Sequence, residues 1–270
     1  MTEKYQAPSV KKAFQILKLL ADTNQEVGIS DLAKHLEISK STVHGITSAM
    51  EEMGVILRNP LNKRYTLGYT VVELGKKGLA RIPLREVARR HLEGLMGETE
   101  ESVFLGILRD HHIFILDVAE NNRAMKITSP SGTKIPLTAG ATGKLFLAHM
   151  DEKSAARCLF QKGLIKYTEN TITDRDEYVE ELERVRNQGY ATDFGEYLQG
   201  VNAVAALIKT DGSLLAAIWV VGFSSSLTKE VMPQVIEKAQ AAAAAISRDF
   251  RRLIAERADY PSLLGPVNKP

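Results

Sequence analysis

Cysteine is almost absent from this chain, since Cys158 is the only one among 270 residues. A single cysteine cannot form an internal disulfide, and it cannot build a zinc site that uses several cysteines. Cys158 falls on the apolar side of a segment with helical spacing, residues 151–160. We therefore expect its side chain to act as a small buried hydrophobic group.

Long hydrophobic runs are also missing. No stretch approaches the roughly 18 uninterrupted apolar residues that a membrane-spanning helix needs. The first residues, MTEKYQAPS, lack the apolar run of a signal peptide. We therefore expect a cytoplasmic protein with no membrane partner. Its composition, 44% hydrophobic and 25% charged, is that of a globular chain with one large domain or two ordinary ones.

An excess of charge of one sign is absent as well. The net charge is +2, and residues 1–75 hold nine Lys and Arg against eight Asp and Glu. Neither part of the chain is therefore a basic domain. If DNA is a partner, the positive charge that contacts it must be local.

Three short segments with helical spacing begin the chain, at 9–22, 30–37 and 39–54. Each opens on a serine that can cap a helix. These serines are Ser9, Ser30 and Ser39. The spacing predicts apolar faces at Val10, Phe14, Leu17 and Leu20 in the first segment and at Leu32, Ala33 and Leu36 in the second. Only Ile38 separates the second segment from the third, which is the spacing of a helix-turn-helix.

After the third helix the period changes from helical to alternating. Residues 55–58 and 64–67 predict strands around the turn 59–63. Three helices followed by a β-hairpin is the order of a winged helix-turn-helix. Residues 68–82 then predict a helical connector, and Pro83 marks a boundary.

Beyond Pro83 the chain mixes helices with adjacent antiparallel strands. The expected helices are 84–96, 141–150, 151–160, 174–188 and 228–257, and the expected strands are 102–108, 113–119, 203–209 and 214–222. The turn 210–213 is a strong hairpin signal. This mixture predicts an α+β fold. We expect a winged helix-turn-helix at 1–68, a helical linker at 69–82 and a second domain at 83–270.

The third helix carries the best candidates for contact with DNA. A helical wheel places Val43, Ile46, Met50 and Met53 on the core side and Ser41, His44, Gly45, Ser48 and Glu52 on the outward side. The outward side is small, polar and nearly uncharged, which suits a helix that enters the major groove with its N-terminus first. Serine and histidine can bond base edges or phosphates, and the helix N-terminus itself favours phosphate.

Gly45 lies in the middle of that outward side, where glycine costs roughly 1 kcal/mol relative to alanine. One interpretation is that the missing side chain lets the helix backbone approach DNA closely. The alternative is that Gly45 avoids a clash with the second helix or is neutral.

The hairpin turn adds two cations and an amide, which can reach phosphate or the minor groove, although a charged turn is often only solvated. The predicted DNA-contacting residues are Lys40, Ser41, Thr42, His44, Gly45, Ser48, Asn62, Lys63 and Arg64.

Enzyme and metal chemistry find little support in the sequence. The stretch 140–144, GATGK, departs from a phosphate-binding loop because Thr138 and Leu145 stand where that motif needs glycine and a hydroxyl residue. His111 and His112, beside Asp110, are neighbours in a turn and tend to point apart, so we expect surface histidines rather than metal ligands. No nucleophile elbow or metal-binding helix motif is present, and we expect no cofactor.

The sequence resembles the IclR family of bacterial transcriptional regulators over nearly its whole length. The residues that carry the resemblance are 9-SVKKAFQILKLL-20, 28-GISDLAKHLEISKSTVHGI-46, 64-RYTLG-68, 136-PLTAGATGKLFLA-148, 189-GYATDFGEYLQGVNAVAA-206 and 211-DGSLLAAIWVVG-222. The resemblance implies a winged helix for operator DNA, a helical linker and a GAF-like effector domain with an antiparallel sheet. It also implies a homodimer, often paired into a tetramer, whose effector is a small carboxylate or aromatic acid.

Three positions, in two segments, depart from the family pattern. Members commonly carry arginine directly after the Ser-Thr-Val-His segment, where this chain has Gly45. Trp219 and Val221 stand where the family often has small hydroxyl residues facing the effector, which indicates a tighter and more apolar site.

The loop at 138–144 leads into a helix N-terminus, where free backbone amides can hold a carboxylate. The resemblance assigns that contact to Ala141, Thr142 and Gly143. Asp193 and Glu196 are candidates for the opposite wall, with a loop salt bridge as the alternative. Leu207, Trp219 and Val221 are candidates for an apolar floor, although a tryptophan in an apolar strand is often simply core.

The sequence therefore predicts a ligand-responsive transcriptional regulator, more often a repressor, which binds operator DNA as a dimer or tetramer. The alternative is a small-molecule-binding enzyme or sensor whose N-terminal domain contacts protein.

Overall fold

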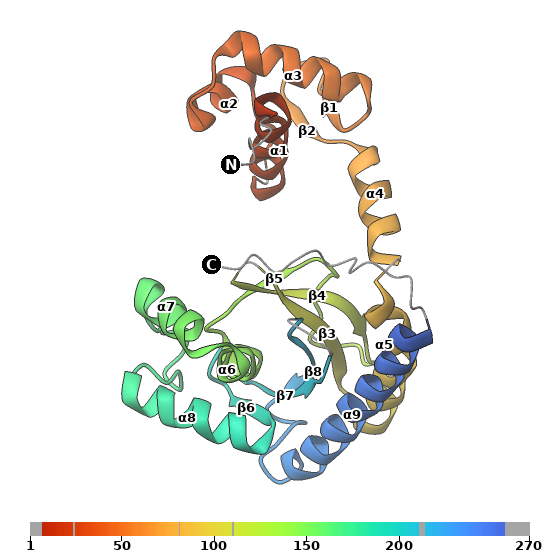
Figure 1. Ribbon diagram of the computed structural model, residues 1–270, viewed down its shortest axis with the longest axis vertical. Coiled ribbons are helices and arrows are strands. Elements are labelled where there is room, and N and C mark those ends of the chain that lie inside the picture. The colour runs from red at the N-terminus through yellow and green to blue at the C-terminus, as the bar shows by residue number, and fades with distance from the viewer. Residues whose placement is uncertain (1–6, 24, 81, 110, 211–213, 257–270) are drawn as a thin grey trace. The chain divides into compact units, whose positions relative to one another are not determined.

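The computed structural model describes residues 7–23, 25–80, 82–109, 111–210 and 214–256. The chain divides into two compact units, Met1–Arg81 and Ile82–Pro270, and each is described by itself (Figure 1). Among the described residues, no helix combines the length and the apolar character needed to span a membrane.

The N-terminal unit is a winged helix-turn-helix. Its elements are α1 (Pro8–Asp22), α2 (Ile29–Leu36), α3 (Lys40–Glu52), β1 (Ile56–Arg58), β2 (Tyr65–Leu67) and α4 (Tyr69–Ala80). Strands β1 and β2 pair antiparallel, with Ile56 opposite Leu67. Val27, in the loop before α2, exchanges backbone hydrogen bonds of 3.0 and 2.9 Å with Tyr65. This bridge ties the hairpin to the helices.

Only the third of the predicted serine caps is correct. Ser39 is the N-cap of α3, where its hydroxyl accepts from the Thr42 amide at 3.2 Å. Helix α1 instead begins at Pro8, whose fixed φ suits the first helical position, so Ser9 lies inside the helix. Helix α2 begins after Gly28, whose amide donates to the Asp31 carboxylate at 3.4 Å, and Ser30 is likewise inside.

The apolar faces of the first and third helices differ from the prediction. In α1 the buried residues are Ile16 and Leu20, while Val10 and Phe14 are 56% and 61% exposed. Helix α3 buries Val43 and Met50 as predicted, with Ile46 partly buried, but Met53 at the C-cap is 69% exposed. The helix ends at Glu52, so Met53 stands outside its last turn. Thr47 takes a buried place because its hydroxyl donates to the Val43 carbonyl at 2.9 Å.

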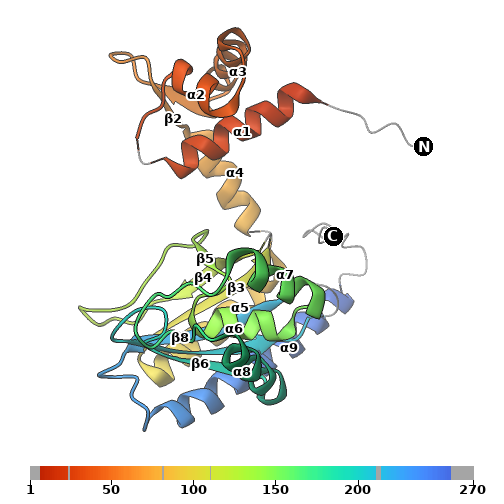
Figure 2. The ribbon, with the colours of Figure 1, turned by 90° about the vertical axis from the view of Figure 1, so that its left-hand side faces the viewer.

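The C-terminal unit is an antiparallel sheet covered by helices on both faces. Its strands are β3 (Ser102–Arg109), β4 (His112–Ala119), β5 (Lys134–Pro136), β6 (Tyr190–Phe194), β7 (Val201–Ile208) and β8 (Ala216–Phe223), in the order β5-β4-β3-β8-β7-β6. Helices α5 (Pro83–Thr99) and α9 (Met232–Glu256) pack together on one face. Helices α6 (Gly140–His149), α7 (Glu152–Lys162) and α8 (Arg175–Gln188) lie on the other face, in front of the sheet in Figure 2.

This unit confirms the predicted α+β class and adds two strands. Neither added strand gives a long apolar run in the sequence. Strand β5 has only three residues, and β6 is an edge strand that pairs only with β7. Residues 211–213 of the predicted hairpin turn lie outside the described residues. The flanking strands β7 and β8 pair antiparallel, with Ile208 opposite Ala216.

Candidate DNA-binding face and effector site

The outward side of α3 is exposed and small. Ser41, His44, Gly45 and Ser48 are all exposed, and so is Lys40 at the start of the helix. Thr42 is partly buried, and its hydroxyl contacts the Ser39 hydroxyl at 2.8 Å. Thr42 therefore helps to cap the helix N-terminus. The other five of these residues face solvent.

Gly45 has open space on its outward side. A Cβ built at this position meets no atom within 4 Å outside its own helix turn. The interpretation that Gly45 avoids a clash with α2 is therefore wrong.

The turn between β1 and β2, called here the wing tip (residues 59–64), is held by an acidic side chain from the loop between α1 and α2. The Asn59 side-chain amide donates to the Glu26 carboxylate at 2.9 Å, and the Asn62 amide donates to the same group. The pKa of Glu26 is lowered, first by the hydrogen bond from Asn62 and then by that from Asn59. Arg64 donates to the Glu26 carbonyl at 2.9 Å and lies 3.4 Å from Asp31.

The wing tip thus presents less free charge than the sequence predicts. Asn62 and Arg64 already have partners inside the unit, although both remain exposed. Lys63 is exposed and adopts a left-handed backbone conformation with φ of 59°. Of the three predicted wing residues, Lys63 projects most freely.

In the C-terminal unit, the effector candidates gather around the N-terminus of α6. This helix begins at Gly140, and its first turn is buried. The Gly143 amide donates to the Ala139 carbonyl at 3.0 Å, so Gly143 cannot supply a free amide as predicted. The available amides are those of Gly140, Ala141 and Thr142, because the first turn of a helix has no intrahelical partners.

Gly143 instead permits close packing. A Cβ at this position would lie 2.4 Å from the Leu137 carbonyl oxygen. Glycine is therefore required for the loop before α6 to cross the helix.

Asp193 faces the start of α6 from strand β6. A Cβ on Gly140 would lie 2.2 Å from the Asp193 Oδ2 atom, which places this carboxyl group against the first turn. Its other oxygen accepts from the Glu196 amide at 2.6 Å. Burial is the main cause that raises the pKa of Asp193 to about 6. A neutral carboxyl group can donate a hydrogen bond, which an ionised one cannot.

The sequence reasoning missed Lys144 as a structural residue. Its side chain is 2% exposed, and its Nζ lies 2.7 Å from Glu196 and 3.1 Å from Glu181 of α8. The salt-bridge interpretation therefore holds for Glu196, whereas Asp193 is held by a backbone amide. Burial raises the pKa of Glu196 despite the nearby lysine. A lysine inside the apolar stretch 143–148 was the available signal, because a buried cation needs a partner.

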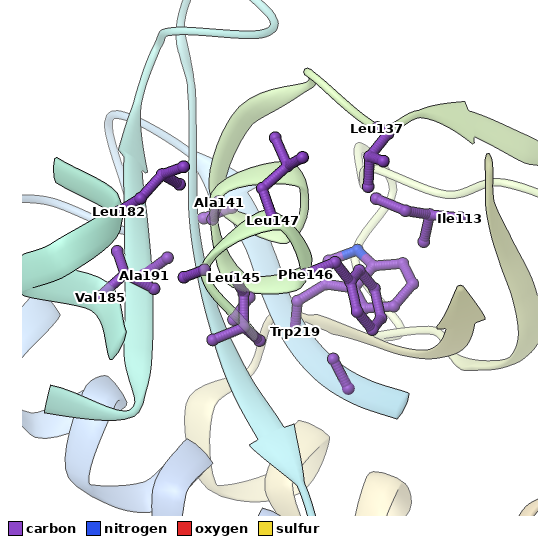
Figure 3. Close-up of a cluster of buried hydrophobic side chains, with 14 of the residues drawn as sticks. Ile113, Leu137, Ala141, Leu145, Phe146, Leu147, Leu182, Val185, Ala191 and Trp219 are labelled. Carbon is purple, nitrogen blue, oxygen red and sulfur yellow. The ribbon is translucent and has the colours of Figure 1, made fainter. Parts of the chain in front are cut away.

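The sheet beneath α6 forms an apolar floor. Trp219 is 4% exposed, and its ring stacks on Phe104 with centroids 5.5 Å apart. Figure 3 shows Trp219 beside Phe146 of α6. Leu207 and Val221 on the same sheet face are only partly buried. Trp219 is thus a core residue in this structure, while Leu207 and Val221 keep some accessible surface.

Two hydroxyl groups on this side of the unit are buried and lack a hydrogen-bond partner among the described residues. They belong to Ser102, which is opposite Val221 in the ladder, and Tyr178 of α8. Burial is the first cause that raises the pKa of Tyr178, followed by the negative charges of Glu196 and Glu181. Neither residue was predicted, because isolated Ser and Tyr carry no sequence signal.

The open grooves of the unit lie elsewhere. One groove of about 560 Å³ is lined by Asn170, Phe194, Glu196, Asn202, Ser224, Thr228, Lys229 and Glu230. A second, of about 300 Å³, runs between α8 and the start of α9. Of the predicted effector residues, Glu196 alone lines either of these two grooves.

The remaining candidates are Cys158 and the two neighbouring histidines of the β3–β4 turn. Cys158 is half-buried rather than fully buried, and its Sγ lies 3.2 Å from His111 Nδ1. No group of three His, Cys, Asp or Glu side chains within the described ranges is arranged to hold a metal ion. Asp110 lies outside the described residues.

Two domain families match the chain. The IclR helix-turn-helix domain matches residues 9–60, and the bacterial transcriptional regulator IclR C-terminal domain matches residues 76–248.

Individual relatives agree with these families. HTH-type transcriptional regulator XynR of Escherichia coli (strain K12) is 31% identical over 241 residues, which are 89% of this chain and 96% of that protein. Transcriptional repressor IclR of the same strain is 28% identical over 205 residues, 75% of each chain. The crystal structure of an IclR regulator from Alicyclobacillus acidocaldarius is 28% identical, with a TM-score of 0.78 over 91% of this chain and 100% of that one.

These relatives and both domain families are transcriptional regulators and not enzymes, so the enzyme alternative is wrong. The chain belongs to the IclR family of bacterial transcriptional regulators.

Proposed function

We propose that this chain is a ligand-responsive repressor. Residues 1–68 bind double-stranded operator DNA, residues 69–82 link the two parts, and residues 83–270 bind a small organic or aromatic acid. The protein works in the cytoplasm as a homodimer or homotetramer, without a cofactor. Repression is supported by the relatives named Transcriptional repressor IclR and Acetate operon repressor.

The exposed, small side of α3 is the observation that carries this proposal. A helix whose outward side from Ser41 to Ser48 is mostly small and polar can enter the major groove deeply. Its N-terminus, closed by Ser39, also favours a phosphate group. We assign DNA contact to Lys40, Ser41, Thr42, His44, Gly45, Ser48, Asn62, Lys63 and Arg64. In a dimer, two such helices engage a pseudo-palindromic site, since protein symmetry is mirrored in operator symmetry.

We place the effector between the start of α6 and the sheet. The contacts assigned are Gly140 in place of Gly143, with Ala141, Thr142, Asp193, Glu196, Leu207, Trp219 and Val221. Buried amides without intrahelical partners favour a carboxylate. An IclR homologue from Microbacterium hydrocarbonoxydans, 22% identical with a TM-score of 0.74 over 90% of this chain and 99% of that one, was solved with 4-hydroxybenzoate. That acid is the first one to test.

Protonation of Asp193 explains how an acid can bind beside a carboxyl group. Two ionised carboxylates at the start of α6 repel each other, whereas a neutral Asp193 donates a hydrogen bond to the bound acid. Because the pKa of Asp193 is raised to about 6, binding at neutral pH takes up a proton. Affinity for the acid therefore rises as the pH falls toward 6.

Release of DNA by acids tests this proposal. The full chain is bound to a labelled duplex selected by the protein from a random-sequence pool, and 4-hydroxybenzoate and short aliphatic acids are added at pH 5.5 and 7.5. We expect one of these acids to weaken DNA binding, more strongly at the lower pH, and Asp193→Asn to remove the pH dependence. If none of the acids binds the protein or changes its DNA affinity at either pH, the assignment of an acid effector is wrong.

A further inference from the structure

The wing tip carries an apolar side chain that nothing in the domain covers. Leu61 is 91% exposed, more than any other large hydrophobic residue in the described ranges. Single exposed apolar residues are common on protein surfaces and need no explanation by themselves. Leu61 differs because of the backbone that holds it.

That backbone is fixed by several hydrogen bonds. The Leu61 amide donates to the Asn59 side-chain oxygen at 3.0 Å, and the Lys63 amide donates to the Asn59 carbonyl at 2.9 Å. The Arg64 amide donates to the Asn62 side-chain oxygen at 2.9 Å. Both asparagine side chains are in turn clamped by Glu26. The tip is therefore preorganised, which lowers the entropy lost when it binds a partner.

The same contacts select which side chains point away from the domain. Asn62 and Arg64 are turned toward Glu26 and Asp31. Leu61 and Lys63 remain as the projecting pair, one apolar and one cationic. In Figure 2 the β1–β2 turn extends beyond helices α1, α2 and α3.

An apolar group beside a cation on a narrow hairpin fits the DNA minor groove. That groove is about 6 Å wide, which is too narrow for a helix but wide enough for the tip of a β-hairpin. Minor-groove proteins insert leucine and similar side chains against base steps while their cations meet phosphates. We propose that Leu61 is a minor-groove contact of the wing, which disfavours G·C pairs in the flank of the operator, with Lys63 on the adjacent phosphate. This inference rests on the proposed binding of operator DNA.

Base analogues test this assignment directly. The duplex selected by the full chain from a random pool is prepared with its flanking pairs as A·T, as inosine·C or as G·C. Inosine·C matches A·T in the minor groove and G·C in the major groove, because only guanine adds the minor-groove amino group. We expect the wild-type chain to bind the first two duplexes equally and the G·C duplex about tenfold more weakly.

Leu61→Ala should weaken binding to the A·T duplex about tenfold and remove the discrimination against G·C. In Leu61→Ala the salt dependence of DNA binding should stay unchanged, because no charge is lost. Lys63→Ala should reduce the slope of log affinity against log salt concentration by about 0.9 in magnitude. Leu57→Ala is the matched control, since Leu57 is 41% exposed on β1 away from the tip. Thermal unfolding of Leu61→Ala should match wild type, because so exposed a side chain contributes little to the core.

Each contrary result has a separate meaning. If the wild-type chain selects no DNA, the proposed function fails. If wild type binds but Leu61→Ala binds all three duplexes as wild type does, the minor-groove assignment is overturned. Loss of affinity that is equal on all flanks, together with a changed sedimentation coefficient, would show that Leu61 contacts a second copy of the chain, and this also overturns the assignment.

Discussion

Gly45 shows how one missing side chain bears on both stability and binding. Because a Cβ there meets nothing within 4 Å, Gly45→Ala should stabilise the N-terminal unit by about 1 kcal/mol, the helix cost of glycine. If the α3 backbone approaches DNA closely at this point, the same change should weaken DNA binding. Urea unfolding and a DNA titration measure the two effects.

Gly94→Ala is the matched control for Gly45→Ala. Gly94 is exposed in α5, and a Cβ there also meets nothing within 4 Å. It should leave DNA affinity unchanged. Gly45→Arg is a second test of this position, because it adds the cation that the family commonly has there. If its DNA affinity equals wild type at several salt concentrations, the outward-face account of position 45 is wrong.

Asp193 should make the protein less stable as it ionises. Its pKa is raised from 3.8 to about 6, so the folded state holds the proton more tightly than the unfolded state does. Its contribution to stability is full below pH 4 and is lost as the pH rises through 6, which lowers the free energy of unfolding by about 3 kcal/mol. Asp193→Asn should therefore raise stability at pH 7 and flatten the dependence between pH 4 and 6, as followed by denaturant unfolding.

Asp249 should have the opposite effect on how stability depends on pH. The hydrogen bond from Arg90, followed by that from His91, lowers the pKa of Asp249 to about 2. Its contribution is present above pH 4 and is lost as the pH falls toward 2. If Asp193→Asn and wild type share one pH profile between pH 4 and 6, the buried carboxyl group is not responsible for it.

At the scale of the helix, caps decide where elements begin. Ser39→Ala should destabilise the N-terminal unit by about 1 kcal/mol, because the Thr42 amide loses its acceptor. Ser30→Ala should change stability by less than about 0.5 kcal/mol, since Ser30 lies inside α2 after the Gly28 cap. Equal losses in thermal unfolding would contradict the assigned caps.

The buried lysine of α6 ties this helix to α8 and to the loop after β6. Lys144→Met leaves the largely buried Glu196 without its cation, while Glu181 keeps Arg184 at 2.8 Å, and the change should cost about 3 kcal/mol. Lys166→Met is the control, because Lys166 and Glu169 are 54% and 90% exposed, and such pairs contribute at most about 1 kcal/mol. Denaturant unfolding of both variants compares them, and a loss for Lys144→Met no larger than that of the control would refute the buried network.

The helices and the inner strands could be predicted because their apolar signals are strong: β3 is a continuous apolar run, and α9 has helical spacing. Edge strands β5 and β6 could not, since their pairing depends on a neighbour that local sequence does not reveal. The helix starts at Pro8 and after Gly28 compete with nearby serines as sequence signals, and they are set by the fixed φ of Pro8 and by the hydrogen bond from Gly28 to Asp31. Among the site residues, the exposed side of α3 could be predicted from a helical wheel. The clamp of Glu26 on Asn62, 36 residues away, depends on how the loop folds back onto the wing.

At the scale of the whole molecule, regulation requires that DNA and effector influence each other. An effector shifts an equilibrium only when its affinity differs between two states of the protein. If an acid weakens DNA binding by some factor, DNA must weaken binding of that acid by the same factor. Calorimetric titration of the acid with and without the selected duplex should give that factor, and acid binding that ignores DNA would contradict a regulatory role for the acid.

DNA binding by the full chain tests the central claim most directly. The protein is titrated against its selected duplex at two salt concentrations, with unrelated competitor DNA present. We predict binding that weakens with salt and survives the competitor, because phosphate contacts set the salt dependence and α3 supplies the specificity. Binding that the competitor abolishes, or no binding with or without candidate acids, would contradict the assignment of α3 and the wing as a specific DNA-reading surface.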